Sequence, residues 1–199
     1  MRFEEMSDEE LLLWARDGTD ADIRRAVSII FERHKSHIYT LFLRMAVDSA
    51  TAEDLLQETF LRLLRHARRY RPIAKVTTWL YRIAFNLALN ESRRRSVRVH
   101  LSLNPETNPD TLRVIDTVAS EEADPFERLS DRECESLVRE VLEMLPPQQR
   151  AVLILCDMEG LSYEEAGKVL GLRPGTVGSR LCRARRTFAF LFLRALKGE

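Results

Sequence analysis

The 199-residue chain has no apolar run long enough to cross a membrane. Glycine, proline and cysteine are all scarce. The chain holds 7 glycines and few alternating apolar–polar runs, which argues against a sheet. Cys134, Cys156 and Cys182 are odd in number and far apart, so they predict neither a disulfide framework nor a metal cluster. The acidic N-terminus lacks the order of a signal peptide, which predicts a cytoplasmic protein without membrane insertion.

Motifs that are typical of catalysis or metal binding are also missing. The chain has no glycine-rich phosphate loop, no H-E-x-x-H and no C-x-x-C. His34 and His37 share a helix face, but the sequence offers no clear third ligand beside them. We therefore expect no catalytic residue, no metal and no cofactor, and we do not expect an enzyme.

The formal net charge is zero, but charges of opposite sign are segregated along the chain. Residues 1–58 carry a net charge of −6 and residues 99–136 carry −7. Residues 62–98 carry +10 and residues 173–199 carry +6. Two separate basic blocks indicate two contacts with a polyanion, whereas an overall basic coat would indicate unspecific attraction.

Apolar residues recur at helical spacing almost throughout, and we expect an all-α fold of two small helical domains. Prolines punctuate an acidic strip at 99–125, which is typical of a linker. We expect one domain at 1–98 and the other at 126–199. The expected helices span 7–17, 20–46, 51–68, 78–95, 126–144, 148–157, 162–170 and 175–195.

The most informative stretch, residues 160–186, is typical of two short helices joined by a tight turn. Ser162 and Glu165 have the S-x-x-E spacing of a capping box. Gly171 stands where the first helix must stop, and Pro174 favours the start of the second. The second helix should bury one stripe, made by Val177, Leu181, Ala184 and Phe188.

The other faces of this second helix are polar and basic, as in a helix-turn-helix whose second helix enters a DNA major groove. The alternative is an ordinary helical hairpin with a solvated basic face. The phase of the helix places Cys182 opposite the buried stripe, although cysteine is usually a core residue. The polar faces carry Thr176, Ser179, Arg180, Arg183, Arg185 and Arg186.

Residues 69–95 interleave aromatic and basic side chains, which suits unstacked bases and their phosphates. A loop leads into a helix that Thr77 or Thr78 is expected to begin. Trp79 fits a core position as well as a base contact, and the Arg93–Arg95 run by itself is typical of a solvated helix end. The interleaved residues are Tyr70, Trp79, Tyr81 and Phe85 with Arg71, Lys75, Arg82, Arg93, Arg94 and Arg95.

The helix expected at 51–68 has one apolar face, which includes Phe60. Its other sides carry Asp54, Gln57, Glu58 and Leu61. Acidic residues there fit plain solvation, or a docking face for a large basic or amphipathic partner.

Two motif blocks therefore stand in one chain. The first is AEDLLQETFLRLLRHA followed by TTWLYRIAFN, and the second is LPPQQRAVLILCDMEGLSYEEAGKVLG with GTVGSRLCRARR. Together they closely resemble the bacterial RNA polymerase sigma factors, most of all the small extracytoplasmic-function (ECF) group. The resemblance covers about residues 20–190, with the linker matching only in character.

The resemblance implies a region 2 bundle, a region 4 helix-turn-helix, and an alternative sigma factor that promotes promoter melting. The implied partners are core RNA polymerase, through its beta-prime and beta subunits, promoter DNA as duplex and as melted single strand, and an anti-sigma factor. The D-L-x-Q-E-x-F block, which lies against a coiled coil of beta-prime in the family, implies polymerase contacts by Asp54, Gln57, Glu58 and Leu61, with Phe60 in the core.

The family's loop before the W-L-Y-R-I-A-x-N block captures a base flipped from the melted minus-10 element, and here that loop is 70–77. Gly178 departs from the pattern, because relatives often place a long or basic residue there. The implied minus-10 contacts are Tyr70, Arg71, Lys75, Thr78, Trp79, Arg82, Asn86, Arg93 and Arg94. The implied minus-35 contacts are Arg173, Thr176, Ser179, Arg180, Cys182, Arg183 and Arg186.

Two other functions fit parts of this pattern. A two-domain regulator that binds duplex DNA without polymerase would need neither a docking helix nor a loop for melted strands. An interaction protein that sequesters a sigma-binding partner would lack the two segregated basic blocks.

Overall fold

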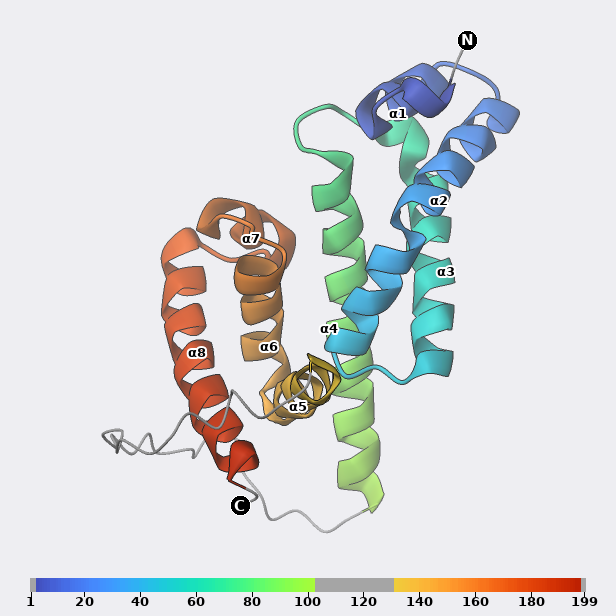
Figure 1. The fold of residues 1–199 in the computed structure, drawn as a ribbon. Coiled ribbons are helices and arrows are strands. Elements are labelled where there is room, and N and C mark those ends of the chain that lie inside the picture. The colour runs from blue at the N-terminus through green and yellow to red at the C-terminus, as the bar shows by residue number, and fades with distance from the viewer. Residues whose placement is uncertain (1–2, 103–130, 198–199) are drawn as a thin grey trace.

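The computed structural model describes residues 3–102 and 131–197, which form helices joined by turns, with no strand in these two ranges (Figure 1). The all-α expectation is confirmed. The first half contains η1 (Phe3–Glu5), α1 (Asp8–Arg16), α2 (Asp20–Arg44), α3 (Ser49–His66), η2 (Ala67–Arg69) and α4 (Val76–Ser102). The second contains α5 (Asp131–Met144), α6 (Pro147–Leu153), the π-helical turn η4 (Ile154–Met158), α7 (Tyr163–Leu170) and α8 (Pro174–Leu196).

Most helix boundaries follow from local capping. Ser7 and Thr19 each accept a backbone N–H in a capping box at the starts of α1 and α2, and Asp48 accepts the Thr51 N–H at the start of α3. These starts lie within two residues of the expected ones. The expected residues 126–130 lie outside the described ranges.

Two of the expected helices differ in detail from the structure. The helix α4 begins at Val76, one or two residues before Thr77 or Thr78, and it continues to Ser102 rather than ending near residue 95. The helix expected at 148–157 is a short α6 followed by the wider π-helical turn η4.

The helix α4 belongs to the first half and also packs against the second, with α2 and α3 on one side of it and α6 and α7 on the other (Figure 1). Its buried side chains are spread around the helix: Leu80 and Phe85 are both buried, and they lie roughly 140° apart at 3.6 residues per turn. This wide apolar surface fits a helix that is covered from more than one direction.

The second half is built around the expected stripe of α8. Val177, Leu181 and Ala184 are fully buried, and Phe188 is partly buried with its ring stacked 5.7 Å from that of Phe192. No described helix is long and apolar enough to span a membrane.

The turn between α7 and α8 has the expected geometry. Ser162 and Glu165 form the reciprocal capping box, and Gly171 ends α7 in the left-handed conformation with φ 68°. The Leu172 N–H then donates to the Gly167 carbonyl at 2.9 Å. A Cβ at Gly167 would lie 2.6 Å from the Leu172 carbonyl oxygen, so the turn needs glycine inside α7 as well as after it.

Arg150 joins the two halves, a role that no local sequence pattern indicates. Its side chain is only 5% exposed, and it donates to the carbonyl of Met45 at 2.7 Å and to those of Glu143 and Leu145 at 2.6 and 3.0 Å. Burial lowers the pKa of Arg150, and the nearby Glu143 charge opposes this effect. Backbone carbonyls from both halves thus accept hydrogen bonds from the two terminal nitrogens of this guanidinium, whereas its buried Nε–H finds no acceptor among the described residues.

The Gly167→Ala substitution tests this turn. Its methyl group would meet backbone, so we expect the free energy of unfolding to fall by about 1–3 kcal/mol in urea unfolding of the full chain. The matched control is Gly175→Ala in the first turn of α8, where a Cβ meets nothing within 4 Å and stability should hold or rise slightly. Equal stability of the two variants would contradict the close approach of the Leu172 carbonyl to Gly167.

Candidate nucleic-acid interface

The face of α8 opposite its buried stripe is open. Leu181 and Ala184 are buried, whereas Cys182 between them is exposed, so the expected orientation of this helix is confirmed. Cys156 is half-buried, and burial together with the Asp157 charge raises the pKa of its thiol. Of the other residues singled out here, Arg173, Ser179, Arg183 and Arg186 are exposed, and Thr176 and Arg180 are half-buried.

The arginines of this face are not equivalent. Arg185 donates two hydrogen bonds to the Asp157 carboxylate, at 2.9 and 2.5 Å, and this pairing raises the pKa of Arg185. Arg183 makes only a long 3.5 Å contact with the Ser179 carbonyl. A guanidinium that is already paired has less to offer a phosphate, which the sequence could not reveal.

Packing between α7 and α8 explains why glycine stands at position 178. A Cβ there would lie 3.3 Å from Cε2 of Tyr163, so glycine lets the Tyr163 ring of α7 pack closely against α8. The side of α8 at Gly178 therefore faces α7 and not the open surface.

The second candidate surface lies around the loop between η2 and α4. Tyr70 is 5% exposed, its ring stacks 5.9 Å from that of Trp79, and its hydroxyl donates to the Ala74 carbonyl at 3.1 Å. Burial, aided by the Glu9 charge, raises the pKa of Tyr70. Tyr70 thus shapes the loop from within, whereas Ile73 at its tip is 84% exposed.

A pocket of about 440 Å³ opens beside this loop. Trp79 and Ile73 supply apolar walls, and cationic side chains stand around them. A cleft with a planar aromatic wall and positive charge around it suits an unstacked base and its phosphate. The lining residues are Arg69, Tyr70, Arg71, Ile73, Ala74, Thr78, Trp79, Arg82 and Lys168.

Further along α4, the polar residues singled out from the sequence reach solvent. Arg82 and Asn86, one turn apart, are exposed, as are Arg93 and Arg94. Arg95 differs, because its guanidinium donates to Asp48 and to the Ala46 carbonyl. Arg95 therefore ties α4 to the turn before α3.

The α3 surface agrees with the sequence pattern. Phe60 is 5% exposed and packs edge-on against Phe31, with ring centroids 5.0 Å apart, so its core position is confirmed. Asp54, Gln57 and Leu61 are exposed on another face. Glu58 lies among them but is half-buried and bonded to Arg62 at 2.7 Å, which lowers the pKa of Glu58.

The buried carboxylate of Glu159, in the second half of the molecule, forms hydrogen bonds with side chains of the first half. The Glu159 side chain is 4% exposed, and it accepts hydrogen bonds from His37 at 2.6 Å, Tyr81 at 2.8 Å and Arg44 at 3.0 Å. Burial and the Glu159 carboxylate raise the pKa of Tyr81. Sequence reasoning missed this cluster because its members are separated by up to 122 residues.

Both histidines of α2 form hydrogen bonds to carboxylates. His34 bonds to Asp8 at 2.5 Å and His37 bonds to Glu159, so both imidazoles have protein partners. The described residues contain no group of three or more side chains placed to hold a metal ion.

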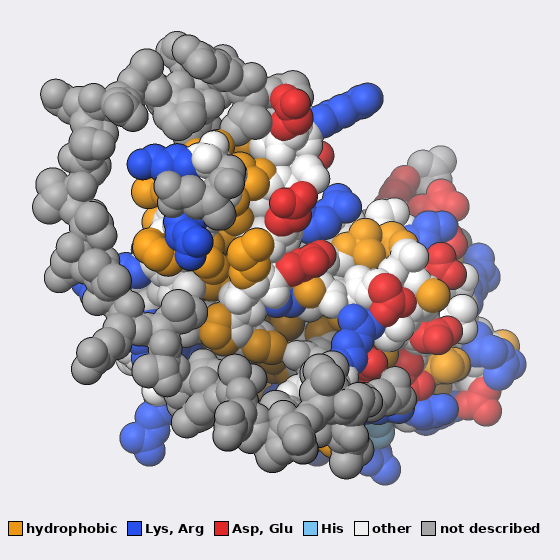
Figure 2. Space-filling view, turned by 90° about the horizontal axis from the view of Figure 1, so that it is seen from below, with side chains coloured by type: hydrophobic (Ala, Val, Ile, Leu, Met, Phe, Trp, Pro, Cys, Tyr) orange, Lys and Arg blue, Asp and Glu red, His pale blue; other side chains and the backbone are white. Residues whose placement is uncertain are grey.

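Large apolar side chains are exposed at the end of α5 and along α8. Met144, Phe190 and Leu193 are 58, 42 and 55% exposed. Figure 2 views the molecule from below, the end at which α8 terminates, and shows hydrophobic side chains gathered over one part of that face.

Comparison with known proteins finds two family models that match this chain. Residues 30–98 match sigma-70 region 2, and residues 136–188 match sigma-70 region 4. The chain is 38% identical over 157 residues to the ECF RNA polymerase sigma factor SigE of Mycolicibacterium smegmatis, covering 79% of this chain and 58% of SigE. It is 33% identical over 185 residues to the RNA polymerase sigma factor CarQ of Myxococcus xanthus, covering 92% of this chain and 94% of CarQ.

Solved structures share the fold. One is the sigma factor RpoE of Bartonella quintana, which was co-crystallised with the anti-sigma factor NepR. It matches with a TM-score of 0.60 and 25% sequence identity, and the match covers 81% of this chain and 92% of the RpoE chain. CnrH, in complex with the cytosolic domain of CnrY, has a TM-score of 0.61 at 23% identity and covers 92% of this chain and 96% of its own.

Regions 2 and 4 on one helical chain define a sigma factor. The chain belongs to the ECF group of RNA polymerase sigma factors. It is an alternative sigma factor that directs promoter-specific transcription initiation, and such proteins are initiation factors rather than enzymes.

The Glu159→Ala substitution tests the contact between regions 2 and 4. It removes the shared acceptor of His37, Tyr81 and Arg44, so the two regions should separate in a larger fraction of molecules and the radius of gyration measured by X-ray scattering should rise. Glu164→Ala, at an exposed position on α7, should leave it unchanged. A Glu159→Ala chain as compact as the wild type would show that this cluster does not hold the regions together.

Proposed function

We propose that region 2, spanning α1 to α4, docks on core RNA polymerase and opens the minus-10 element, while region 4, spanning α5 to α8, reads the minus-35 element. The observation that carries this proposal is the pairing of two different surfaces. A walled pocket with aromatic and cationic sides lies on region 2, and an open basic helix lies on region 4. The first suits extruded bases and the second suits a major groove.

In region 2, an unstacked base enters the pocket beside Trp79. Arg71, Lys75 and Arg82 then meet its phosphates, and Asn86 offers an amide to a neighbouring base. Binding energy for the open strand shifts the duplex equilibrium toward melting, without hydrolysis of any cofactor. Arg93 and Arg94, further along the same helix, contact backbone.

In region 4, the exposed side of α8 enters the major groove at the minus-35 element. Arg180, Arg183 and Arg186, with Arg173 at the helix start, meet phosphates and base edges. Thr176, Ser179 and Cys182 lie close to the groove floor.

Core polymerase contacts the exposed side of α3 through Asp54, Gln57, Glu58 and Leu61. Anti-sigma factors are bound by RpoE of Bartonella quintana, and by analogy we propose that an anti-sigma factor holds this chain inactive in the cytoplasm.

Engagement of both promoter elements requires the two regions to separate. The elements lie 25 base pairs apart by their names, which is about 85 Å at 3.4 Å per base pair. In the present arrangement α7 packs against α4, and Lys168 of α7 forms part of the region 2 pocket. Binding to polymerase and promoter therefore disrupts the contacts of Glu159 and Arg150.

The pocket assignment predicts a selective defect in melting. Arg82→Ala or Asn86→Ala should slow open-complex formation about tenfold, the equivalent of 1.4 kcal/mol, while affinity for core polymerase stays unchanged. Permanganate reactivity of promoter thymines measures opening, and fluorescence anisotropy measures core binding. If core affinity fell as much as opening, α4 would belong to the docking surface instead.

The docking assignment predicts that Asp54→Lys weakens core polymerase binding at least tenfold with helicity unchanged. Glu53→Lys makes the same charge change at an adjacent exposed position on another side of α3, and it should bind normally. Equal affinities for the two variants would place docking elsewhere. A regulator that acts without polymerase would show no affinity at all.

The region 4 assignment predicts different salt dependences for neighbouring arginines. Arg183→Ala should reduce the slope of log affinity of the holoenzyme for promoter against log salt by about one unit. Arg185→Ala should change it less, because Asp157 already holds that guanidinium. A larger effect at Arg185 than at Arg183 would reverse the proposed orientation of α8.

A further inference from the structure

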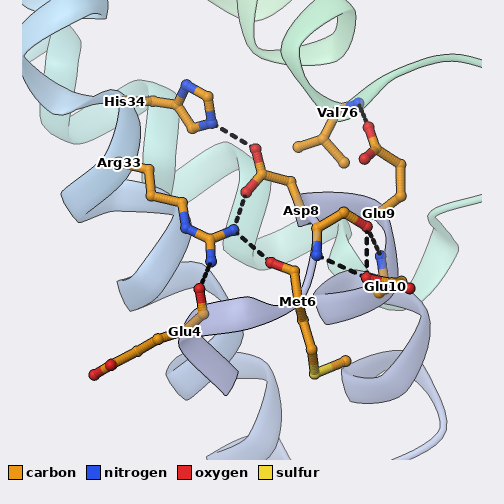
Figure 3. A network of polar contacts seen from close by, with 9 residues as sticks. Glu4, Met6, Asp8, Glu9, Glu10, Arg33, His34 and Val76 are labelled. Carbon is orange, nitrogen blue, oxygen red and sulfur yellow. Dashed lines mark hydrogen bonds and ion pairs between the residues drawn. The ribbon is translucent and has the colours of Figure 1, made fainter. Parts of the chain in front are cut away.

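The start of α4 is capped by a residue from another helix. The first N–H groups of a helix have no partner within it. Here the Val76 N–H donates to Oε1 of Glu9 at 2.8 Å, across 67 positions of sequence (Figure 3). Val76 is fully buried, so water is poorly placed to replace this acceptor.

Glu9 itself sits on a firmly anchored helix end. Beside it, Asp8 accepts hydrogen bonds from Arg33 at 2.8 Å and from His34 at 2.5 Å. Arg33 also donates to the carbonyls of Met6 and Glu4, both at 2.8 Å (Figure 3). Burial would raise the pKa of Asp8, but the bonds from His34 and Arg33 outweigh it and hold that pKa below its usual value.

Asp8 thus fixes the first turn of α1 to α2, and this turn places the Glu9 carboxylate at the start of α4. A negative charge at a helix N-terminus interacts favourably with the helix dipole, and a carboxylate is a stronger acceptor than a neutral oxygen.

The capped turn adjoins the candidate minus-10 pocket. Val76 lies between Ala74, whose carbonyl accepts the Tyr70 hydroxyl, and Thr78 and Trp79, which line the pocket. Any shift of Val76 moves the loop 70–75 relative to the Trp79 ring. The proximity of the Glu9 charge to Tyr70 is a second link between α1 and this loop.

We propose that Glu9 is a positioning residue for minus-10 recognition, which holds the first turn of α4 and the loop 70–75 in the geometry that captures an unstacked base. This inference rests on the function proposed above for the pocket. The helix α1 lies outside residues 30–98 that match sigma-70 region 2, so that match assigns Glu9 no role.

The test compares Glu9→Ala and Glu9→Gln with Glu10→Gln in the full chain. Glu10 belongs to the capping box of α1, and its glutamine variant changes the net charge equally while keeping a cap. Hydrogen exchange of the Val76 amide is measured on the free chain, and open-complex formation and core affinity are measured on the holoenzyme.

Glu9→Ala should speed Val76 exchange and slow open-complex formation, each about tenfold, and weaken base preference in the minus-10 element, with core affinity unchanged. Glu9→Gln should be intermediate, because its amide oxygen still accepts a hydrogen bond. Glu10→Gln should match the wild type. The rescue by glutamine separates positioning from a general loss of stability.

Two results would overturn the inference: wild-type Val76 exchange in Glu9→Ala, or fast exchange with wild-type opening and base preference. Trp79→Ala distinguishes this failure from failure of the pocket. If Trp79→Ala impairs opening and Glu9→Ala does not, only the role of Glu9 falls. If neither impairs opening, the proposed pocket function falls with it.

Discussion

The burial of α4 from two directions is the constraint on which the rest of this molecule depends. One side of the helix completes the region 2 core with α2 and α3, and α6 and α7 of region 4 also pack against it. Apolar side chains therefore cover a wide arc of α4, and between Val76 and Leu89 the only exposed residues are Arg82 and Asn86, which lie one turn apart on the same strip. The same helix thus forms the core, the contact with region 4 and the surface proposed for melted DNA.

The features that could be predicted from the sequence are those with local causes. The capping box of Ser162 and Glu165 and the left-handed Gly171 act within a few residues, and the structure has both. Helical phase was sufficient to predict that Val177 is buried and that Cys182 is exposed, although cysteine usually prefers the core. Phe60 was placed correctly for the same reason.

The features that could not be predicted are contacts between distant residues. No local signal joins Glu159 to His37, Arg150 to the Met45 carbonyl, or Asp157 to Arg185. The start of α4 lies one or two residues before the expected Thr77 or Thr78, because its cap comes from another helix and no nearby Ser or Thr provides it. These long-range contacts decide which arginines are available to DNA and how the pocket is held.

We propose that one chain recognises two separate promoter elements, one as duplex and one as melted strand, and only with polymerase. Transcription by core polymerase with this chain from a library of randomised promoters is the decisive test. We expect two enriched sequence blocks about 25 base pairs apart, with the downstream block inside the melted segment. A single enriched block, or the same enrichment by the free chain without polymerase, would contradict it.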